Sequence, residues 1–193
     1  MVELLSLYHP IPPNDRKLFR SLIKSQTYAK GDFLLFDGDV QSELYLVKSG
    51  VAYLYAEKEG KQKILDFAYH NRFCVDLKSF SSQEASAYCI QCIEDCEVES
   101  ISYEHLEQVF DASAAVERAY RLLLERILGA LLDKAMQMEL LSMGERFKWI
   151  MQKRSELFGL VPHKYIASYI NVDATNFSKL YNQHCINNGL YYE

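Results

Sequence analysis

Hydrophobic and polar positions follow a helical period most clearly over residues 114–143. Apolar side chains recur there three or four positions apart, a spacing that places them on one side of an α-helix. They are Val116, Tyr120, Leu123, Leu124, Ile127, Leu128, Leu131, Leu132, Ala135, Met138 and Leu141. Charged residues fill the other side and no proline interrupts the run. At 1.5 Å per residue, the pattern predicts a helix of about 42 Å.

Such a helix is too long for one small domain to cover. Gly129 lies in its middle, where glycine is unfavourable for a helix by about 1 kcal/mol but permits close approach of another backbone. We therefore expect the helix to pack on its own chain along one flank and on a second copy along the other. The alternative is a long core helix of a monomer.

The preceding region carries short segments of aromatic and branched residues instead, at 33–36, 44–47, 51–55, 64–67, 86–93 and 96–102. Glycine and aspartate turns separate most of them, a pattern that predicts an antiparallel sandwich or barrel. A short helix over 16–24, capped by Asn14 or Asp15, is expected before the strands. Ser102 is expected to cap a helix that leads into the long one.

Three further helices are predicted toward the C-terminus. Gly144 opens a helix over 145–155, and Gly159 ends that region. Pro162 suits a first helical position, Asn171 suits the left-handed conformation of a tight turn over 170–172, and Asp173 suits the cap of a second helix. This order is typical of a helix-turn-helix, although plain helical hairpins have a similar pattern.

Composition places the chain among ordinary globular proteins, with 193 residues, 49% hydrophobic and 24% charged. Residues 1–13 lack the basic start and long apolar run of a signal peptide. No window approaches the 18 apolar residues of a membrane span. We therefore expect a cytoplasmic protein without membrane contact.

The net charge of −5 is unevenly distributed along the chain. Residues 1–113 hold 11 Lys and Arg against 18 Asp and Glu, whereas residues 114–193 hold 10 against 8. The C-terminal part is therefore the part able to meet phosphate groups.

Three of the five cysteines, Cys89, Cys92 and Cys96, have the spacing C-x2-C-x3-C. In an extended strand Cys92 and Cys96 share a face about 13 Å apart, and Cys89 faces the other side. We therefore expect no metal or cluster at this motif, and reduced thiols in general.

Several stretches resemble the cAMP receptor protein/FNR (Crp/Fnr) family of bacterial transcription regulators, over nearly the whole chain. They are Lys-Gly-Asp at 30–32, Gly-Asp at 38–39, and the segments 44–50, 93–98 and 165–172. The chain is most similar to the shorter regulators of Bacteroidetes-like bacteria. The resemblance implies an α+β fold: an antiparallel, cyclic-nucleotide-binding-like β-roll (jelly roll) over 1–113, a dimerisation helix over 114–143, and a winged-helix-like helix-turn-helix over 144–193.

The resemblance also places an effector pocket in the roll. Its residues here are Phe73, Cys74, Val75, Asp76, Leu77, Ser86 and Ala87. The family uses a Gly-Glu pair for ribose and an Arg for the cyclic phosphate, and this chain has Ser86 at the Arg position. Lys78 is the one cation near Asp76 and Glu84, and desolvating a phosphate there is unfavourable. We expect no tight cAMP binding and no resident cofactor; whether another effector binds stays open.

A second departure concerns DNA recognition. Family members similar to the cAMP receptor protein read base edges with an Arg-Glu pair and a later Arg. The corresponding residues here are Ala174, Thr175 and Lys179. Hydroxyl, amide and ammonium groups remain for adenine or phosphate contacts, at Thr175, Asn176, Ser178, Lys179 and Asn182, and His163, Lys164 and Lys148 are further candidates for phosphate. We expect a homodimer that binds half-sites about 34 Å apart.

Two other classes of function are compatible with a β-roll. A metal-dependent cupin enzyme needs clustered His and carboxylate ligands, and His70 alone lies among the predicted strands. No phosphate loop, nucleophile elbow or paired-acid motif is present, so catalysis is not expected. The stronger alternative is a sensor or protein-interaction protein of this fold that has lost sequence-specific DNA binding, because its cationic face is thin and little chain remains for a wing.

Overall fold

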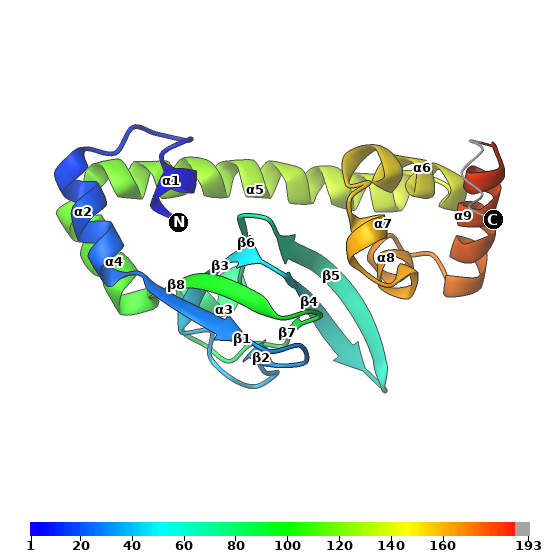
Figure 1. The fold of residues 1–193 in the computed structure, drawn as a ribbon, viewed down its shortest axis with the longest axis horizontal. Helices are drawn as coiled ribbons and strands as arrows, with labels where there is room; N and C mark the ends of the chain where they lie inside the picture. Colours follow the sequence, from blue (N-terminus) through cyan, green and yellow to red (C-terminus); the bar gives the residue numbers. More distant parts are fainter. Residues whose placement is uncertain (188–193) are drawn as a thin grey trace.

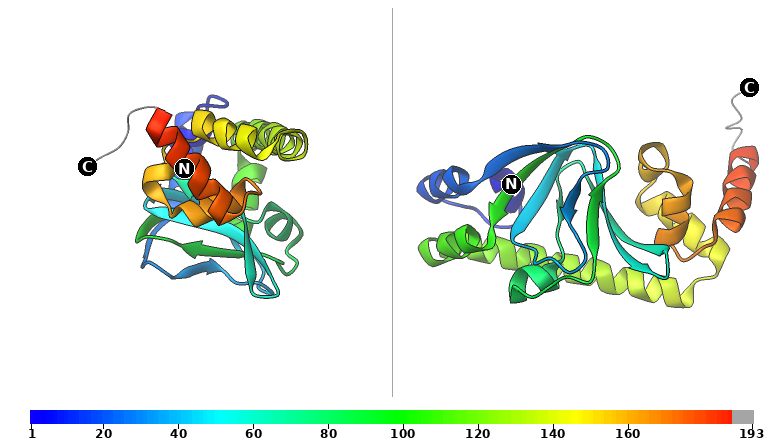
Figure 2. Two further views of the ribbon diagram at one scale, coloured as in Figure 1. Left: turned by 90° about the vertical axis from the view of Figure 1, so that its right-hand side faces the viewer. Right: turned by 90° about the horizontal axis from the view of Figure 1, so that it is seen from below.

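A computed structural model describes residues 1–187. One long helix, α5, runs along the molecule, with two β-sheets against its side and a group of short helices at its end (Figures 1 and 2). The helices are α1 (Val2–Leu5), α2 (Pro13–Leu22), α3 (Leu77–Ser82), α4 (Tyr103–Ala112), α5 (Ala114–Leu140), α6 (Met143–Lys153), α7 (Leu157–Leu160), α8 (His163–Tyr169) and α9 (Ala174–Asn187). The strands are β1 (Lys24–Tyr28), β2 (Phe33–Leu35), β3 (Glu43–Ser49), β4 (Val51–Lys58), β5 (Lys61–Tyr69), β6 (Arg72–Cys74), β7 (Cys89–Cys92) and β8 (Cys96–Ser102).

The strands form two four-stranded antiparallel sheets, in the orders β1-β8-β3-β6 and β2-β7-β4-β5. Buried residues of both sheets meet between them, among them Val47, Ala52, Ala68, Ile90 and Val98. The predicted mixed fold with antiparallel sheets is therefore confirmed.

A second core joins this roll to the helices. It contains Phe19 of α2, Leu46 of β3, Ile101 of β8, Leu106 of α4 and Val116 of α5, all almost fully buried. The first half of α5 therefore shares a buried core with the roll, through Val116, Ala119 and Leu123.

Several predicted boundaries were wrong. The first predicted helix spans Pro13–Leu22 with Pro12 as its cap, so Asn14 and Asp15 lie inside it, and the Asp15 carboxylate instead accepts a hydrogen bond from Ser113 Oγ at 2.5 Å. The predicted cap at Ser102 is confirmed, because its side chain accepts the N–H of His105.

The ends of the later helices also differ from the prediction. The long helix ends at Leu140 rather than at 143, because Ser142 and Glu145 form a capping box that begins α6. The helix expected from 145 therefore starts at Met143. Gly159 lies inside α7 instead of ending a helix.

The expected geometry of the cysteine motif was wrong as well. Cys92 ends β7 and Cys96 begins β8, so the two residues belong to different sheets. Both are buried in the core between the sheets, where Cys96 Sγ donates to Glu94 O at 3.3 Å. The neighbouring Cys96 thiol and burial raise the pKa of Cys92. Within residues 1–187 no group of three or more His, Cys, Asp or Glu side chains is placed to hold a metal.

The turn between β3 and β4 requires glycine. Gly50 has φ +78°, and a Cβ there would lie 2.1 Å from the main-chain oxygen of Asp95. Replacement by alanine should therefore cost more than the roughly 1–2 kcal/mol of the left-handed conformation alone. Urea unfolding of Gly50→Ala checks this. Gly38→Ala is the matched control, because Gly38 has φ +89° and open space at its Cβ. Equal losses for the two variants would contradict the steric argument.

Candidate nucleic-acid interface and ligand-sensing region

The two helices at the C-terminal end are joined by a tight turn. Asn171 has φ +57°, the left-handed conformation predicted for it. The N–H of Val172 donates to Ala167 O at 2.9 Å. Arg146 of α6 donates through Nη1 to Ile170 O at 3.2 Å and to Asn171 O at 3.1 Å. The guanidinium therefore fixes the turn from the side of α6.

The predicted cap at the start of α9 is confirmed. Asp173 Oδ1 accepts the N–H of Asn176 at 2.9 Å, and the Asn176 side-chain amide also binds this carboxylate. These hydrogen bonds hold the pKa of Asp173 below its usual value. Asn176 is therefore already engaged within the cap.

A small aromatic core fixes α9 against its neighbours. Phe177 is fully buried, with its ring centroid 5.5 Å from that of Phe147 on α6 and 5.9 Å from that of Phe158 on α7. Ile166, Ile170 and Val172 complete it, as predicted.

The remaining polar residues predicted on α9 share its outer face. Thr175, Ser178, Lys179 and Asn182 are exposed, and their spacing of three, four and seven places them on one side of the helix. In Figure 1, α9 lies at the outer end of the molecule, away from the sheets. The structure therefore brings four of the five predicted α9 residues together on an open face.

The candidate phosphate contacts on α8 differ from each other. Lys164 is exposed, with Nζ 4.9 Å from the ring centroid of Tyr165. His163 is half-buried, and its ring lies 4.2 Å from that of Tyr181 and 5.8 Å from that of Phe158. Burial lowers the pKa of His163, so it is largely neutral at pH 7. His163 thus packs with the aromatic core, and Lys164 alone of the two presents a charge to solvent.

Two of the predicted effector residues are hydrogen-bonded to each other in the roll. Asp76 and Ser86 are buried, and Ser86 Oγ donates to Asp76 Oδ2 at 2.7 Å. Asp76 also caps α3 by accepting the N–H of Lys78 at 3.1 Å. Cys74 is buried, Ala87 is exposed, and Phe73, Val75 and Leu77 are half-buried. The position expected for a phosphate-binding Arg is thus occupied by a hydroxyl that already binds a carboxylate.

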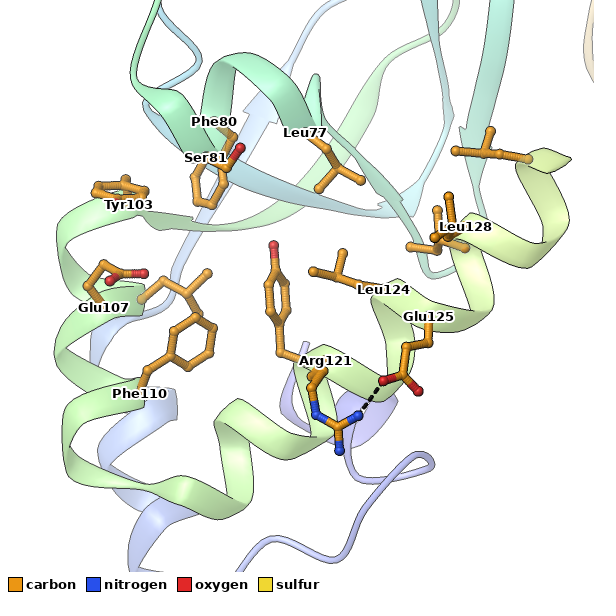
Figure 3. Close-up of a pocket in the computed structure, with 14 residues that line it drawn as sticks. Leu77, Phe80, Ser81, Tyr103, Glu107, Phe110, Arg121, Leu124, Glu125 and Leu128 are labelled. Atoms are coloured by element: carbon orange, nitrogen blue, oxygen red, sulfur yellow. Dashed lines mark hydrogen bonds and ion pairs between the residues drawn. The ribbon is translucent and has the colours of Figure 1, made fainter.

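An apolar cavity of about 460 Å³ lies on the other side of α3, between α3, α4 and α5 (Figure 3). Of the predicted effector residues, Leu77 lines this cavity. Phe80 of α3, Phe110 of α4 and Leu124 and Leu128 of α5 point toward it. This cavity was not predicted from the sequence, where only the helical spacing of Leu124 and Leu128 is visible.

The second half of α5 exposes large apolar side chains. Leu128, Leu131, Leu132, Met136 and Leu140 are each between 48% and 70% exposed. Gly129, in the same stretch, has nothing within 4 Å of its Cβ position. This apolar face of α5 is continuous with the cavity, because Leu128 and Leu131 belong to both.

Within the described residues, no helix is both long enough and apolar enough to cross a membrane.

The chain is similar to known proteins in both sequence and fold. Residues 25–113 match the family model of the cyclic nucleotide-binding domain. The chain is 22% identical over 122 residues to the human (Homo sapiens) potassium/sodium hyperpolarization-activated cyclic nucleotide-gated channel 1. The match covers 62% of this chain but only 13% of the channel.

Solved structures that are similar over most of the chain include transcription regulators. The c-di-GMP-responsive global regulator CLP of Xanthomonas campestris has a TM-score of 0.71 at 18% identity, covering 94% of this chain and 95% of CLP. FixK2 of Bradyrhizobium japonicum has a TM-score of 0.73 at 15% identity, covering 86% of each chain. A transcriptional regulator of the crp/fnr family from Eubacterium rectale has a TM-score of 0.67 at 19% identity, covering 92% of this chain and 85% of its own. The resemblance expected from the sequence is confirmed at the level of the fold.

Proposed function

We propose that this chain is a homodimeric DNA-binding transcription regulator of the Crp/Fnr type. The observation that carries the proposal is the exposed polar face of α9, whose first turn is capped by Asp173. The long helix α5 in addition exposes large apolar side chains that a second copy could cover. In this proposal residues 1–113 sense an effector, 114–143 join two copies, and 144–193 bind DNA.

The polar face of α9 suits a major groove. Lys179 supplies a cation for phosphate, and Thr175, Ser178 and Asn182 supply hydroxyl and amide groups for base edges or phosphate. Asn176 acts in the cap and His163 in the core, so neither is a principal contact in this proposal. An Arg bound to guanine through two hydrogen bonds contributes about 1–3 kcal/mol of discrimination. Because this face lacks such an Arg, we expect A/T-rich sites.

Dimerisation is part of the same proposal. Exposed large apolar side chains gather on one stretch of α5, and burying them against a second copy is favourable by about 25 cal/mol per Å². Two copies double the phosphate contacts and present two α9 helices to half-sites about 34 Å apart.

A binding experiment tests the DNA proposal. DNA selected by the protein from a random-sequence library should shift in mobility, with affinity falling steeply as salt rises. Lys179→Ala should weaken binding to all sequences and reduce the salt slope by about one per chain. Lys17→Ala, which removes an exposed cation from α2, is the matched control and should change neither quantity.

The alternative is a sensor or protein-interaction protein that has lost sequence-specific DNA binding. Its supporting observation is the low charge of the α9 face, where Lys179 is the one cation among the exposed residues Thr175, Ser178, Lys179 and Asn182. If selection enriches no sequence and binding does not depend on salt, this alternative replaces the DNA-binding proposal.

The roll is expected not to bind cAMP tightly. Ser86 and Asp76 are already hydrogen-bonded to each other, and Asp76 would repel the phosphate in a poorly solvated place. Titration calorimetry with cAMP should therefore give no saturable heat at micromolar ligand. A micromolar dissociation constant would contradict the expectation.

A further inference from the structure

The C-terminal helices and the roll share one hydrophobic core. Tyr53 of β4 stacks on Tyr165 of α8 with ring centroids 5.2 Å apart. Phe67 of β5 lies 5.5 Å from Tyr169 of α8. These rings belong to the same buried cluster as Phe177 of α9. The contact of α8 with β5 is therefore an extension of the interior rather than a loose meeting of two surfaces.

A buried guanidinium lies in the middle of this contact. Arg154, directly after α6, is only 7% exposed. Its Nη1 donates to Asp66 Oδ1 at 2.5 Å and to the Tyr169 hydroxyl at 3.1 Å. Its Nε donates to the Tyr69 hydroxyl at 3.0 Å, and Nη2 donates to Phe67 O at 2.8 Å. Three of these four acceptors belong to β5.

The neighbours of Arg154 favour its protonated, positively charged form. Burial alone would lower its pKa, but the Asp66 carboxylate and the phenols of Tyr169 and Tyr69 outweigh burial and raise it. Because the N–H donors of a guanidinium lie in one rigid plane, all of them are satisfied only by one arrangement of acceptors. This requirement opposes sliding of α8 along β5. An apolar contact alone has no such directional requirement.

The same strand also reaches the turn before α9. The N–H of Ile64 donates to Ser168 Oγ at 3.0 Å, and Ser168 Oγ lies 3.3 Å from Gln62 O. Lys63 Nζ binds Ser168 O and the side-chain oxygen of Asn171. The strand β5 therefore holds both the end of α8 and the residue whose left-handed conformation directs the chain into α9.

The long helix completes the contact. Lys134 of α5 donates through Nζ to Leu65 O at 2.7 Å, and its Nζ lies 3.4 Å from the ring centroid of Tyr169. Burial lowers the pKa of Lys134 to about 8. Thus α5, β5 and α8 meet around one tyrosine, which links the proposed dimer helix, the roll and the DNA-binding helices.

We propose that Arg154 is a positioning residue for DNA recognition. With Asp66, Tyr69 and Tyr169 it forms the Arg154 latch, which fixes α8 on β5 and so sets the direction of α9 relative to α5. The strand β5 is then the route by which a change in the roll alters DNA binding. This inference rests on the proposed function, because it concerns how two α9 helices are held for two half-sites.

The test compares two DNA probes. One is a two-half-site sequence selected by the protein itself, and the other is the same DNA with one half-site scrambled. Asp66→Asn, which keeps the size of a side chain that is 51% exposed, should weaken binding to the two-half-site DNA about 5- to 150-fold, the usual range of coupling between sites. Binding to the single half-site should change by less than about twofold, because the α9 face itself is intact. Arg154→Met should act in the same direction and more strongly.

The control variant is Glu3→Gln, which also removes a carboxylate paired with an arginine, Arg20, but at an exposed site on α1 and α2. It should leave both affinities unchanged. A fall of equal size on both probes would indicate a folding defect, and no change on either would mean that the latch does not position α9. Either result overturns the inference.

Hydrogen exchange separates this inference from the DNA proposal. In Asp66→Asn the amide of Ile64 and the amides of α8 should exchange at least about tenfold faster, whereas those of β8 should not change. If the wild-type chain binds no DNA, the proposed function fails and the exchange rates alone decide whether the latch holds α8. Unchanged exchange at Ile64 and α8 would overturn the latch.

Discussion

Replacing Phe177 by alanine should lower the free energy of unfolding by about 3–5 kcal/mol, the usual loss for a buried phenylalanine. The ring is fully buried between α6, α7 and α8 and contacts an aromatic ring on each of them. Its removal leaves a cavity that these short helices close only partly. Urea unfolding followed by circular dichroism measures the loss.

The shape of that transition is informative as well. Because the cluster around Phe177 continues to Tyr53 and Phe67 in the sheets, we expect the variant to unfold in one transition rather than to lose α6–α9 first. Leu7→Ala is the control; Leu7 is 80% exposed, and its replacement should change stability by less than about 0.5 kcal/mol. Two separated transitions, or a loss below about 1 kcal/mol for Phe177→Ala, would contradict the shared core.

Introducing charge on the apolar face of α5 should separate the two copies. Leu128 and Leu132 are 58% and 59% exposed and lie one turn apart. The double variant Leu128→Glu, Leu132→Glu places four carboxylates in the proposed interface, which would be strongly unfavourable there. Sedimentation velocity should show a monomer in place of a dimer. Affinity for a two-half-site DNA should fall about 10²- to 10⁴-fold, because the second α9 helix is no longer held near the first.

The control for this experiment is Arg126→Glu, which makes the same change in net charge per chain at an exposed position on the opposite side of α5. It should leave the chain dimeric. The stability of the separated copies should change little, since the two leucines are more than half exposed in one chain. A wild-type protein that is monomeric at all concentrations would contradict both the interface and the proposed mode of DNA binding.

The strands that could be predicted are those with aromatic and branched residues between glycine turns, as in β3 and β4. The strand β1 was missed because Lys24–Tyr28 is mostly polar and lies at a sheet edge, where alternation is weak. β6 and α3 are too short, at three and six residues, for a period to appear. The end of the long helix was wrong because the start signal of the next helix, the capping box of Ser142 and Glu145, was not recognised.

The turn and the cap of the candidate interface could be predicted because both depend on neighbouring residues in the chain. Asn171 adopts the left-handed conformation itself, and Asp173 binds the backbone N–H three residues later. The Arg154 latch could not be predicted in this way. Arg154 and Asp66 are 88 residues apart in the chain, and nothing around either residue indicates the other. His163 was proposed as a phosphate contact because its aromatic neighbours, also brought together by folding, are not visible in the sequence. The division at 113/114 and 143/144 stays a prediction, and the buried cluster crosses it.

The core that continues from β5 into α8 restricts how this protein can evolve. A roll separated from its helices would expose the rings of Tyr53, Phe67 and Tyr69 to water and become prone to aggregation. Recombination between relatives at the long helix would pair a foreign β5 with a resident Arg154. The roll and the C-terminal helices are therefore expected to be inherited together, and chimeras should fold stably only when the whole contact comes from one parent.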